Sequence, residues 1–238
     1  MRPKAASRER ARRERPIDCA LAEHHASGMR KLSIDVVSDV VCPWCLIGVR
    51  RLEQALEALP DVEAEVRFHP FLLDPSTPDE GVDLRERLRA KYGVSAEGMF
   101  GRVEAAARES GIPLDFTKVT RSVATVRAHT LIRHALSRGT QRALKKALLD
   151  AYFLEGRDVG DVDVLADIAA AHGFDEDEAR ALLRDDQELR ATRQAASAMA
   201  AQGIDGVPFF ILDQRLALSG AQPVETMKAA IERALTSE

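Results

Sequence analysis

Residues 38–56 read SDVVCPWCLIGVRRLEQAL, with two cysteines where a predicted strand passes into a predicted helix. Upstream, residues 32–36 alternate apolar and polar side chains and are rich in β-branched residues, which predicts a β-strand. Downstream, leucines and valines recur at helical spacing until Pro60-Asp61 ends the helix. Residues 62–68 alternate again and predict a second strand, so the cysteines lie inside a β-α-β unit.

The rest of the chain divides into a helical middle and a short β-β-α end. After a proline-containing loop, the sequence from Leu84 to about Gly203 predicts helices throughout, with glycines and capping residues at the helix boundaries. Residues 207–218 predict an antiparallel hairpin, and a final helix follows. We therefore predict an α/β class: a thioredoxin fold (β-α-β … β-β-α) with a large all-helical insertion. Residues 29–75 and 204–238 would form the thioredoxin-like domain, and residues 76–203 the insertion.

The composition favours a folded domain with a separate basic tip. The chain has 238 residues, 45% hydrophobic and 30% charged, with a formal net charge of −4. Residues 1–28 carry a net charge of +3 and lack the apolar stretch of a secretory signal, so we expect a disordered extension. Met29 is an alternative start. No apolar run approaches the roughly 18 to 20 residues of a membrane span, and the charge balance does not favour nucleic acid.

Three cysteines, Cys19, Cys42 and Cys45, are too few for a disulfide-stapled secreted scaffold. The count is typical of a reducing compartment in which one pair is functional, and we expect a cytoplasmic protein. Cys19 falls in the predicted extension and is interpreted as a free thiol without a role.

The spacing of Cys42 and Cys45 predicts a redox-active dithiol. Thiol–disulfide exchange requires a thiolate, and the positive end of a helix dipole at Cys42 favours a negative sulfur. Pro43 suits the first helical position, because its missing N–H would have had no partner there. Cys45 lies three residues on, on the same helical face. Cys42 is therefore the expected nucleophile and Cys45 the expected resolving thiol.

A zinc site and a structural disulfide are weaker interpretations of the same pair. Zinc needs four ligands, and the chain offers neither a second cysteine pair nor a histidine that would complete a site with His69. A loop this short constrains the unfolded chain little, so a structural disulfide would contribute little stability. We expect no metal.

Three neighbours of the dithiol are candidates for supporting roles. Trp44, the single tryptophan, either contacts substrate or packs on the insertion. Asp35 and Asp39 lie on or just after the first strand, where a buried carboxylate near Cys45 could move protons. Either is equally interpretable as a solvated acid at a strand end.

Pro208 lies at the start of the predicted strand that follows Gly206, in an otherwise apolar run. Proline is unusual there, because it cannot donate a hydrogen bond to a neighbouring strand. A cis Val207–Pro208 bond facing the cysteines would supply a reason for this position and would leave the Val207 backbone free to pair with an extended substrate or glutathione. The residues alone do not establish the isomer, since most X–Pro bonds are trans.

Four stretches together resemble the DsbA-like thioredoxin superfamily, most closely its FrnE branch of cytoplasmic bacterial proteins. They are SDVVCPWCLIGVRRLEQAL (38–56), FHPFLLDP (68–75), AYFLEGRDVGD (151–161) and GIDGVPFFILDQRLALSGAQP (203–223). The resemblance runs from about Lys31 to the C-terminus. It implies a thioredoxin fold with a helical insertion, a cis-proline at Pro208, and dithiol–disulfide activity on protein or small-molecule thiols.

The same superfamily contains glutathione-binding relatives, which gives the alternative function. Kappa-class transferases and 2-hydroxychromene-2-carboxylate isomerases resemble this chain in fold, but they typically carry serine at the position of Cys42. Under that alternative, Ser219 could hold a carboxylate of glutathione. One departure is Ala124, where relatives tend to have asparagine, and substrate preference would differ if that position lines the site. No bound cofactor is expected, glutathione is a possible co-substrate, and the chain is expected to be a monomer or homodimer.

Overall fold

The computed structural model describes residues 28–93 and 95–236, and within them the two ends of the chain build one mixed sheet. Strands β1 (Arg30–Ser38) and β2 (Val62–Pro70) run parallel and are joined by helix α1 (Pro43–Glu57). Strands β5 (Phe209–Leu212) and β6 (Leu216–Ser219) form a hairpin, followed by helix α9 (Val224–Thr236). Strand β5 pairs antiparallel with β1, which gives the order β2-β1-β5-β6. The predicted thioredoxin fold is confirmed.

The hairpin turn lies at the predicted dipeptide. Asp213 and Gln214 both have positive φ, 47° and 55°, as a two-residue turn between twisted strands requires. Asp213 also accepts hydrogen bonds from the backbone N–H and hydroxyl of Ser33, at 2.9 and 3.1 Å, which fixes the turn against β1.

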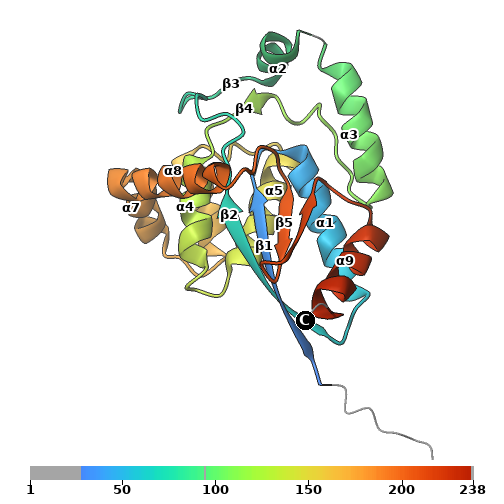
Figure 1. Ribbon diagram of the computed structural model, residues 1–238. Helices are drawn as coiled ribbons and strands as arrows, with labels where there is room; N and C mark the ends of the chain where they lie inside the picture. Colours follow the sequence, from blue (N-terminus) through green and yellow to red (C-terminus); the bar gives the residue numbers. More distant parts are fainter. Residues whose placement is uncertain (1–27, 94, 237–238) are drawn as a thin grey trace, which may run out of the picture.

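Seven helices of the described chain lie between β2 and β5. They are α2 (Leu84–Tyr92), α3 (Glu97–Glu109), α4 (Val126–Ala135), α5 (Gln141–Phe153), α6 (Val162–Ala170), α7 (Glu176–Arg184) and α8 (Asp186–Ala201). Helices α4, α5 and α8 contact β2, so this part of the chain packs along one edge of the sheet (Figure 1). Helices α2 and α3 stand apart from the others, above the end of the sheet at which α1 begins (Figure 1).

The prediction of helix throughout 84–203 was wrong for one stretch. Residues 112–125 contain no helix, and they include β4 (Arg121–Ser122), which pairs with β3 (Val82–Asp83). Pro113 removes a helical donor, and the β-branched residues that follow suit an extended chain. The insertion is helical, with one short two-stranded sheet beneath α2.

Helix α1 is held against the sheet at a position that tolerates no side chain. A Cβ on Gly48 would come within 2.7 Å of Cγ of Pro208 and 3.2 Å of Cζ of Phe210. Glycine therefore lets α1 approach the segment that enters β5. On its other side α1 packs against α9. No helix in the described ranges is long and apolar enough to cross a membrane.

Candidate active site

Cys42 caps the N-terminus of α1. Its backbone is extended, and its carbonyl accepts hydrogen bonds from the N–H groups of Cys45 and Leu46 at 2.9 and 3.2 Å. Pro43 occupies the first helical position, and the first turn contains no acidic residue. The Cys42 sulfur thus lies at the positive end of the helix without a competing carboxylate on the same turn.

Cys45 lies deeper than Cys42. Both thiols are free, and Cys45 is fully buried whereas Cys42 borders a cavity. Burial raises the pKa of Cys45 well above its ordinary value, and the hydrogen bond and charge of Cys42 raise it further; Lys145 and a backbone hydrogen bond from Asp39 act in the opposite direction. Cys45 therefore stays protonated until another group assists its ionisation.

The Val207–Pro208 segment faces the dithiol. Its peptide bond is cis, and the Cys42 thiol donates a hydrogen bond to the Val207 carbonyl, with 3.6 Å between sulfur and oxygen. The carbonyl of Pro208 accepts from the Gly220 N–H at 2.8 Å, which ties this segment to the end of the hairpin. Cys42 and Val207, 165 residues apart in the chain, are therefore in direct contact.

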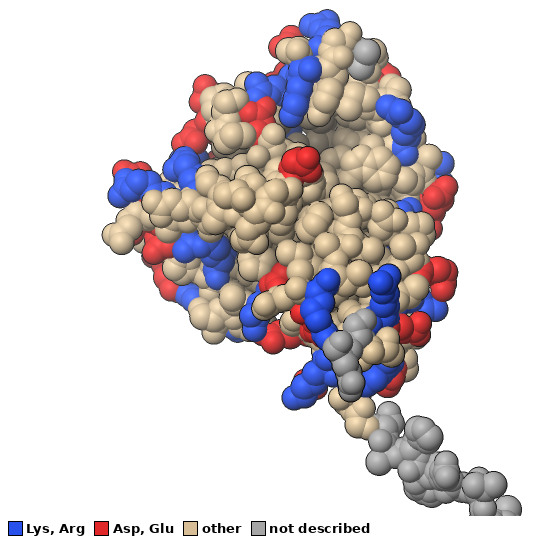
Figure 2. Space-filling model, viewed as in Figure 1, with Lys and Arg blue, Asp and Glu red and all other residues tan. Residues whose placement is uncertain are grey.

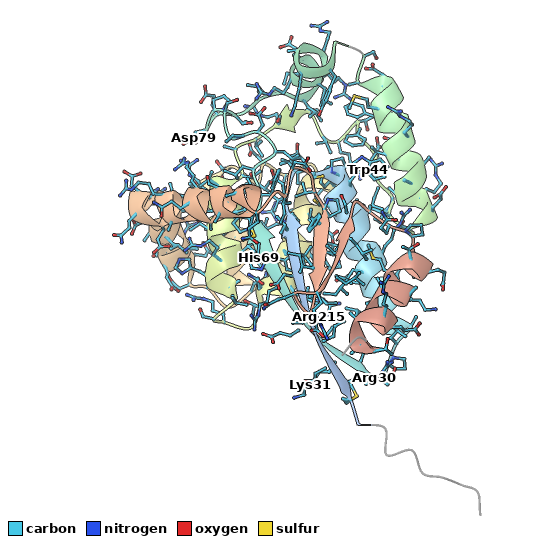
Figure 3. All side chains as sticks on the ribbon, in the orientation of Figure 1. Arg30, Lys31, Trp44, His69, Asp79 and Arg215 are labelled. Atoms are coloured by element: carbon cyan, nitrogen blue, oxygen red, sulfur yellow. The ribbon has the colours of Figure 1, made fainter. Side chains whose placement is uncertain are left out.

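A cavity of about 340 Å³ opens above Cys42. Its floor contains Cys42, Trp44 and Val207, and its walls come from the insertion. The wall residues are mainly apolar and aromatic, and include Leu88, Tyr92, Met99, Phe100, Phe116 and Phe153. The space-filling view shows the hollow below the upper part of the molecule (Figure 2), and Trp44, 40% exposed, lies beside α3 near the start of α1 (Figure 3). This arrangement admits a small molecule or a narrow peptide segment.

Two basic side chains line the same cavity. Arg87 forms an ion pair with Asp74 and donates to the Ser76 hydroxyl. Lys91 lies with its Nζ 5.6 Å from the centroid of the Tyr92 ring, and it has no ion-pair partner in the part of the chain that the structure describes. The wall therefore offers a cation to an anionic group on a bound molecule.

A buried Asp39–His129 pair lies beside the dithiol. The Asp39 carboxylate accepts hydrogen bonds from Val40 N (2.7 Å) and Leu73 N (2.9 Å), and its Oδ1 is 3.1 Å from His129 Nε2. Burial acts to raise the pKa of Asp39, but these hydrogen bonds and the charge of His129 outweigh it and hold that pKa below its ordinary value. Burial lowers the pKa of His129, with Asp39 opposing. The pair is therefore a neutral imidazole against a carboxylate at neutral pH.

The structure brings some predicted residues together and separates others. Cys42, Pro43, Trp44 and Val207 line the cavity, with Cys45 beneath Cys42 and Pro208 adjoining Val207. Ser219 lies exposed on the edge strand β6, paired with Phe209, and is absent from the cavity lining.

Three further sequence candidates also lie outside the cavity. Asp35 pairs with His69 along the sheet, with 2.6 Å between Oδ1 and Nε2, and neither residue borders the cavity. Ala124 is not in the cavity lining either, although its neighbours Val123 and Thr125 are. Predictions about residues 1–27, including Cys19, fall outside the described residues.

Sequence reasoning missed Lys145, a fully buried lysine on α5. A signal was available, because Gln141, Lys145, Leu148 and Tyr152 share one helical face that is otherwise apolar. As for metals, the described residues hold no cluster of three or more histidine, cysteine or acidic side chains that could bind one.

Comparisons with known proteins agree with this geometry. A probable DsbA oxidoreductase from Streptomyces coelicolor superposes with a TM-score of 0.80 and 32% identity, covering 87% of this chain and 91% of that one. An uncharacterized Bacillus subtilis protein, YwbO, is 26% identical over 83% of this chain and 94% of its own length. The cytosolic disulfide reductase DsbM from Pseudomonas aeruginosa, solved with glutathione, shares the fold with a TM-score of 0.63 and 20% identity over 86% of this chain and 100% of that one.

The family assignment follows from a match across most of the chain. A profile of the DSBA-like thioredoxin domain matches residues 33–232, which include both cysteines, the helical insertion and the hairpin. With the fold, the free dithiol at the start of α1 and the similarity to the Streptomyces protein, this match shows that the chain belongs to the DsbA-like thioredoxin family of thiol oxidoreductases.

Proposed function

We propose that this protein is a cytoplasmic, FrnE-like thiol–disulfide oxidoreductase in which Cys42 is the nucleophile, Cys45 resolves and glutathione is the co-substrate. One observation carries the proposal. Cys42 is a free thiol at the positive end of α1, bordering an open cavity, with a second free thiol one turn deeper. A merely structural pair would need no access to a cavity.

The chemistry proceeds through two exchanges. The Cys42 thiolate attacks one sulfur of a substrate disulfide, a Cys42–substrate disulfide forms, and the other substrate sulfur leaves as a thiolate. Cys45 then loses its proton and attacks the Cys42 sulfur, so that the Cys42–Cys45 disulfide forms and the substrate leaves as its second thiolate. The substrate gains two electrons and the dithiol loses two. Two glutathione thiols restore the dithiol and leave as glutathione disulfide.

Binding follows from the cavity walls. The backbone at Gly206 and Val207 supports pairing with an extended substrate, and Trp44 offers an aromatic surface beside the sulfur. Lys91 suits a carboxylate such as those of glutathione. The similarity to DsbM, a cytosolic disulfide reductase whose structure contains glutathione, supports the choice of co-substrate and compartment.

A redox titration tests the proposal. The reduced protein is equilibrated with mixtures of glutathione and glutathione disulfide while the fluorescence of Trp44, the single tryptophan, is recorded. We expect a reversible two-electron transition that Cys42→Ser abolishes. In Cys45→Ser, a mixed disulfide with glutathione should accumulate on Cys42 and be visible by mass spectrometry. A protein without any transition in accessible redox buffers would contradict the proposal.

The same titration separates the glutathione-dependent isomerase or kappa-type transferase alternative. That function uses glutathione without changing its oxidation state, so binding would survive in Cys42→Ser and no disulfide would form. The presence of cysteine at both positions favours redox exchange.

A further inference from the structure

Lys145 is a basic side chain buried inside the protein. It is 1% exposed, and it is the only lysine or arginine among the buried residues of the described chain. Its Nζ has no hydrogen-bond partner among the described residues and lies 6.0 Å from the centroid of the Phe68 ring. Burying an ammonium without a partner is strongly unfavourable, so the position of Lys145 needs a compensating interaction.

The helix that carries Lys145 is fixed against the sheet. One turn before Lys145, the Gln141 side chain accepts a hydrogen bond from Phe68 N at 2.8 Å and donates to Phe68 O at 3.2 Å. Two turns after Lys145, Tyr152 lines the cavity. Lys145 lies between these points on the same inward face, on a helix that contacts α1.

The acidic groups that Lys145 faces come from two elements. Burial lowers the pKa of Lys145, and the negative charges of Cys45, Asp39 and Cys42 act to raise it. Lys145 in turn acts to lower the pKa of His129 on α4. Asp39 already accepts hydrogen bonds from Val40 N and Leu73 N and is paired with His129. The dithiol is therefore the acidic group whose charge remains to be compensated.

We propose that Lys145 is a positioning residue whose positive charge stabilises the thiolate of the reduced Cys42–Cys45 pair. The inference rests on the proposed redox function and deepens it. When two glutathione thiols reduce the disulfide, Cys42 and Cys45 each gain a hydrogen and glutathione disulfide leaves. Release of one proton to water then leaves one thiolate next to the Asp39 carboxylate, and the ammonium offsets this negative charge. In the oxidised protein the ammonium faces Asp39 alone, so Lys145 favours the reduced state.

Lys145→Met tests the charge while keeping a similar length and apolar stem. Replacement of a buried charge by an apolar residue is often neutral or stabilising, so we expect the variant to fold. Loss of a nearby charge should shift the equilibrium constant with glutathione about tenfold toward the disulfide, or about 30 mV. The pH at which iodoacetamide alkylation of Cys42 reaches half its maximal rate should rise by about one unit.

Lys146→Met is the matched control. Lys146 is the next residue on α5, but its side chain is 42% exposed and pairs with Asp150 at 2.6 Å. This variant removes the same charge from the same helix. Its equilibrium constant with glutathione and the pH midpoint of Cys42 alkylation should equal those of the unmodified protein. A Lys145→Met protein that matches Lys146→Met in both measurements would overturn the inference. An unmodified protein without a glutathione transition would instead overturn the proposed function.

A measurement on the unmodified protein keeps the test independent of folding. Because the interaction is reciprocal, Lys145 should have a higher pKa in the reduced protein than in the oxidised one. Titration of lysine labelled with ¹³C at Cε, followed by NMR in both redox states, reads this directly. The same midpoint for Lys145 in both states would contradict the inference.

Discussion

Strand β1 and the residues just after it carry two aspartates four positions apart, each paired with a histidine, and the two pairs differ in burial. Asp35 and His69 are 2.6 Å apart, with side chains 21% and 34% exposed. Asp39 and His129 are 3.1 Å apart, and each side chain is 1% exposed. Water can replace either partner in the first pair, but nothing replaces a lost partner in the second. The same two residue types therefore have different energetic roles.

The difference originates in which element supplies the histidine. His69 is on β2, the direct neighbour of β1 in the sheet. Asp39 follows the end of β1, where α4 brings His129 from 90 residues away. The sheet alone therefore makes the exposed pair, whereas the buried pair exists only when the insertion covers the start of α1.

The largest expected effect is on stability. Asp39→Ala should lower the free energy of unfolding by about 3 to 5 kcal/mol, because two backbone N–H groups and His129 lose a buried acceptor. Asp35→Ala should cost less than about 1 kcal/mol, as for other exposed pairs. Urea unfolding of both variants measures the contrast. Equal losses would show that burial does not distinguish the pairs.

The second effect is a pH dependence of stability. Burial lowers the pKa of His129 below its ordinary 6.5, so as the pH decreases below 6.5 the imidazole becomes protonated in the unfolded chain but stays neutral in the folded protein. The free energy of unfolding should therefore decrease as the pH decreases in this range, by up to about 1.4 kcal/mol per pH unit. His129→Gln should remove this slope and His69→Gln should keep it, as followed by urea unfolding between pH 5 and 8.

Asp39 adds a separate loss in stronger acid. Its folded pKa lies below the ordinary 3.8, so its stabilising contribution is complete above that value and disappears as the pH falls through the folded pKa.

For the His129 prediction, a His129→Gln protein whose stability declines between pH 7 and 5 as steeply as that of the parent would argue against the buried neutral imidazole.

The third and smallest effect concerns the dithiol. Asp39→Asn removes a negative charge beside the thiolate, so alkylation of Cys42 at a fixed pH below the midpoint should become about threefold faster. This change is opposite in sign to that of Lys145→Met. Asp35→Asn, on the exposed pair, should leave the rate unchanged. Parallel iodoacetamide kinetics on the three variants provide the measurement. An Asp39→Asn rate equal to the parent rate would show that the Asp39 charge does not affect the Cys42 thiolate.

Most elements of the fold follow from local patterns in the chain. The alternation in residues 62–68 and the helical spacing after Cys45 correspond to β2 and α1. Asp213-Gln214 forms the predicted turn, since its residue types tolerate positive φ. The stretch 112–125 was mispredicted because its short pairing of β4 with β3 depends on a strand about 40 residues away, and two-residue strands leave no periodic pattern.

The site was predictable only where its residues are close in sequence. Cys42, Pro43, Trp44 and Cys45 are contiguous, and the strand-to-helix junction places them at a helix N-terminus. Ser219 resembled an anion-binding residue in a turn, but the edge position of β6 directs it away from the cavity. No local sequence pattern shows that Ser219 lies outside the cavity, because its position depends on which strand lies next to β1.

Residue spacing and local propensity were sufficient to predict the dithiol, its position at the start of a helix and the order of the surrounding elements, since both are local properties. The groups that surround the dithiol depend instead on tertiary packing. Lys145, His129 and Val207 lie 100, 84 and 162 residues from Cys45 along the chain. Packing of α4 and α5 against β2, and of α5 against α1, removes Lys145 and His129 from water, whereas the strand β5 that follows Val207 pairs with β1. Burial is the physical cause that turns these two ordinary side chains into the electrostatic environment of the sulfurs.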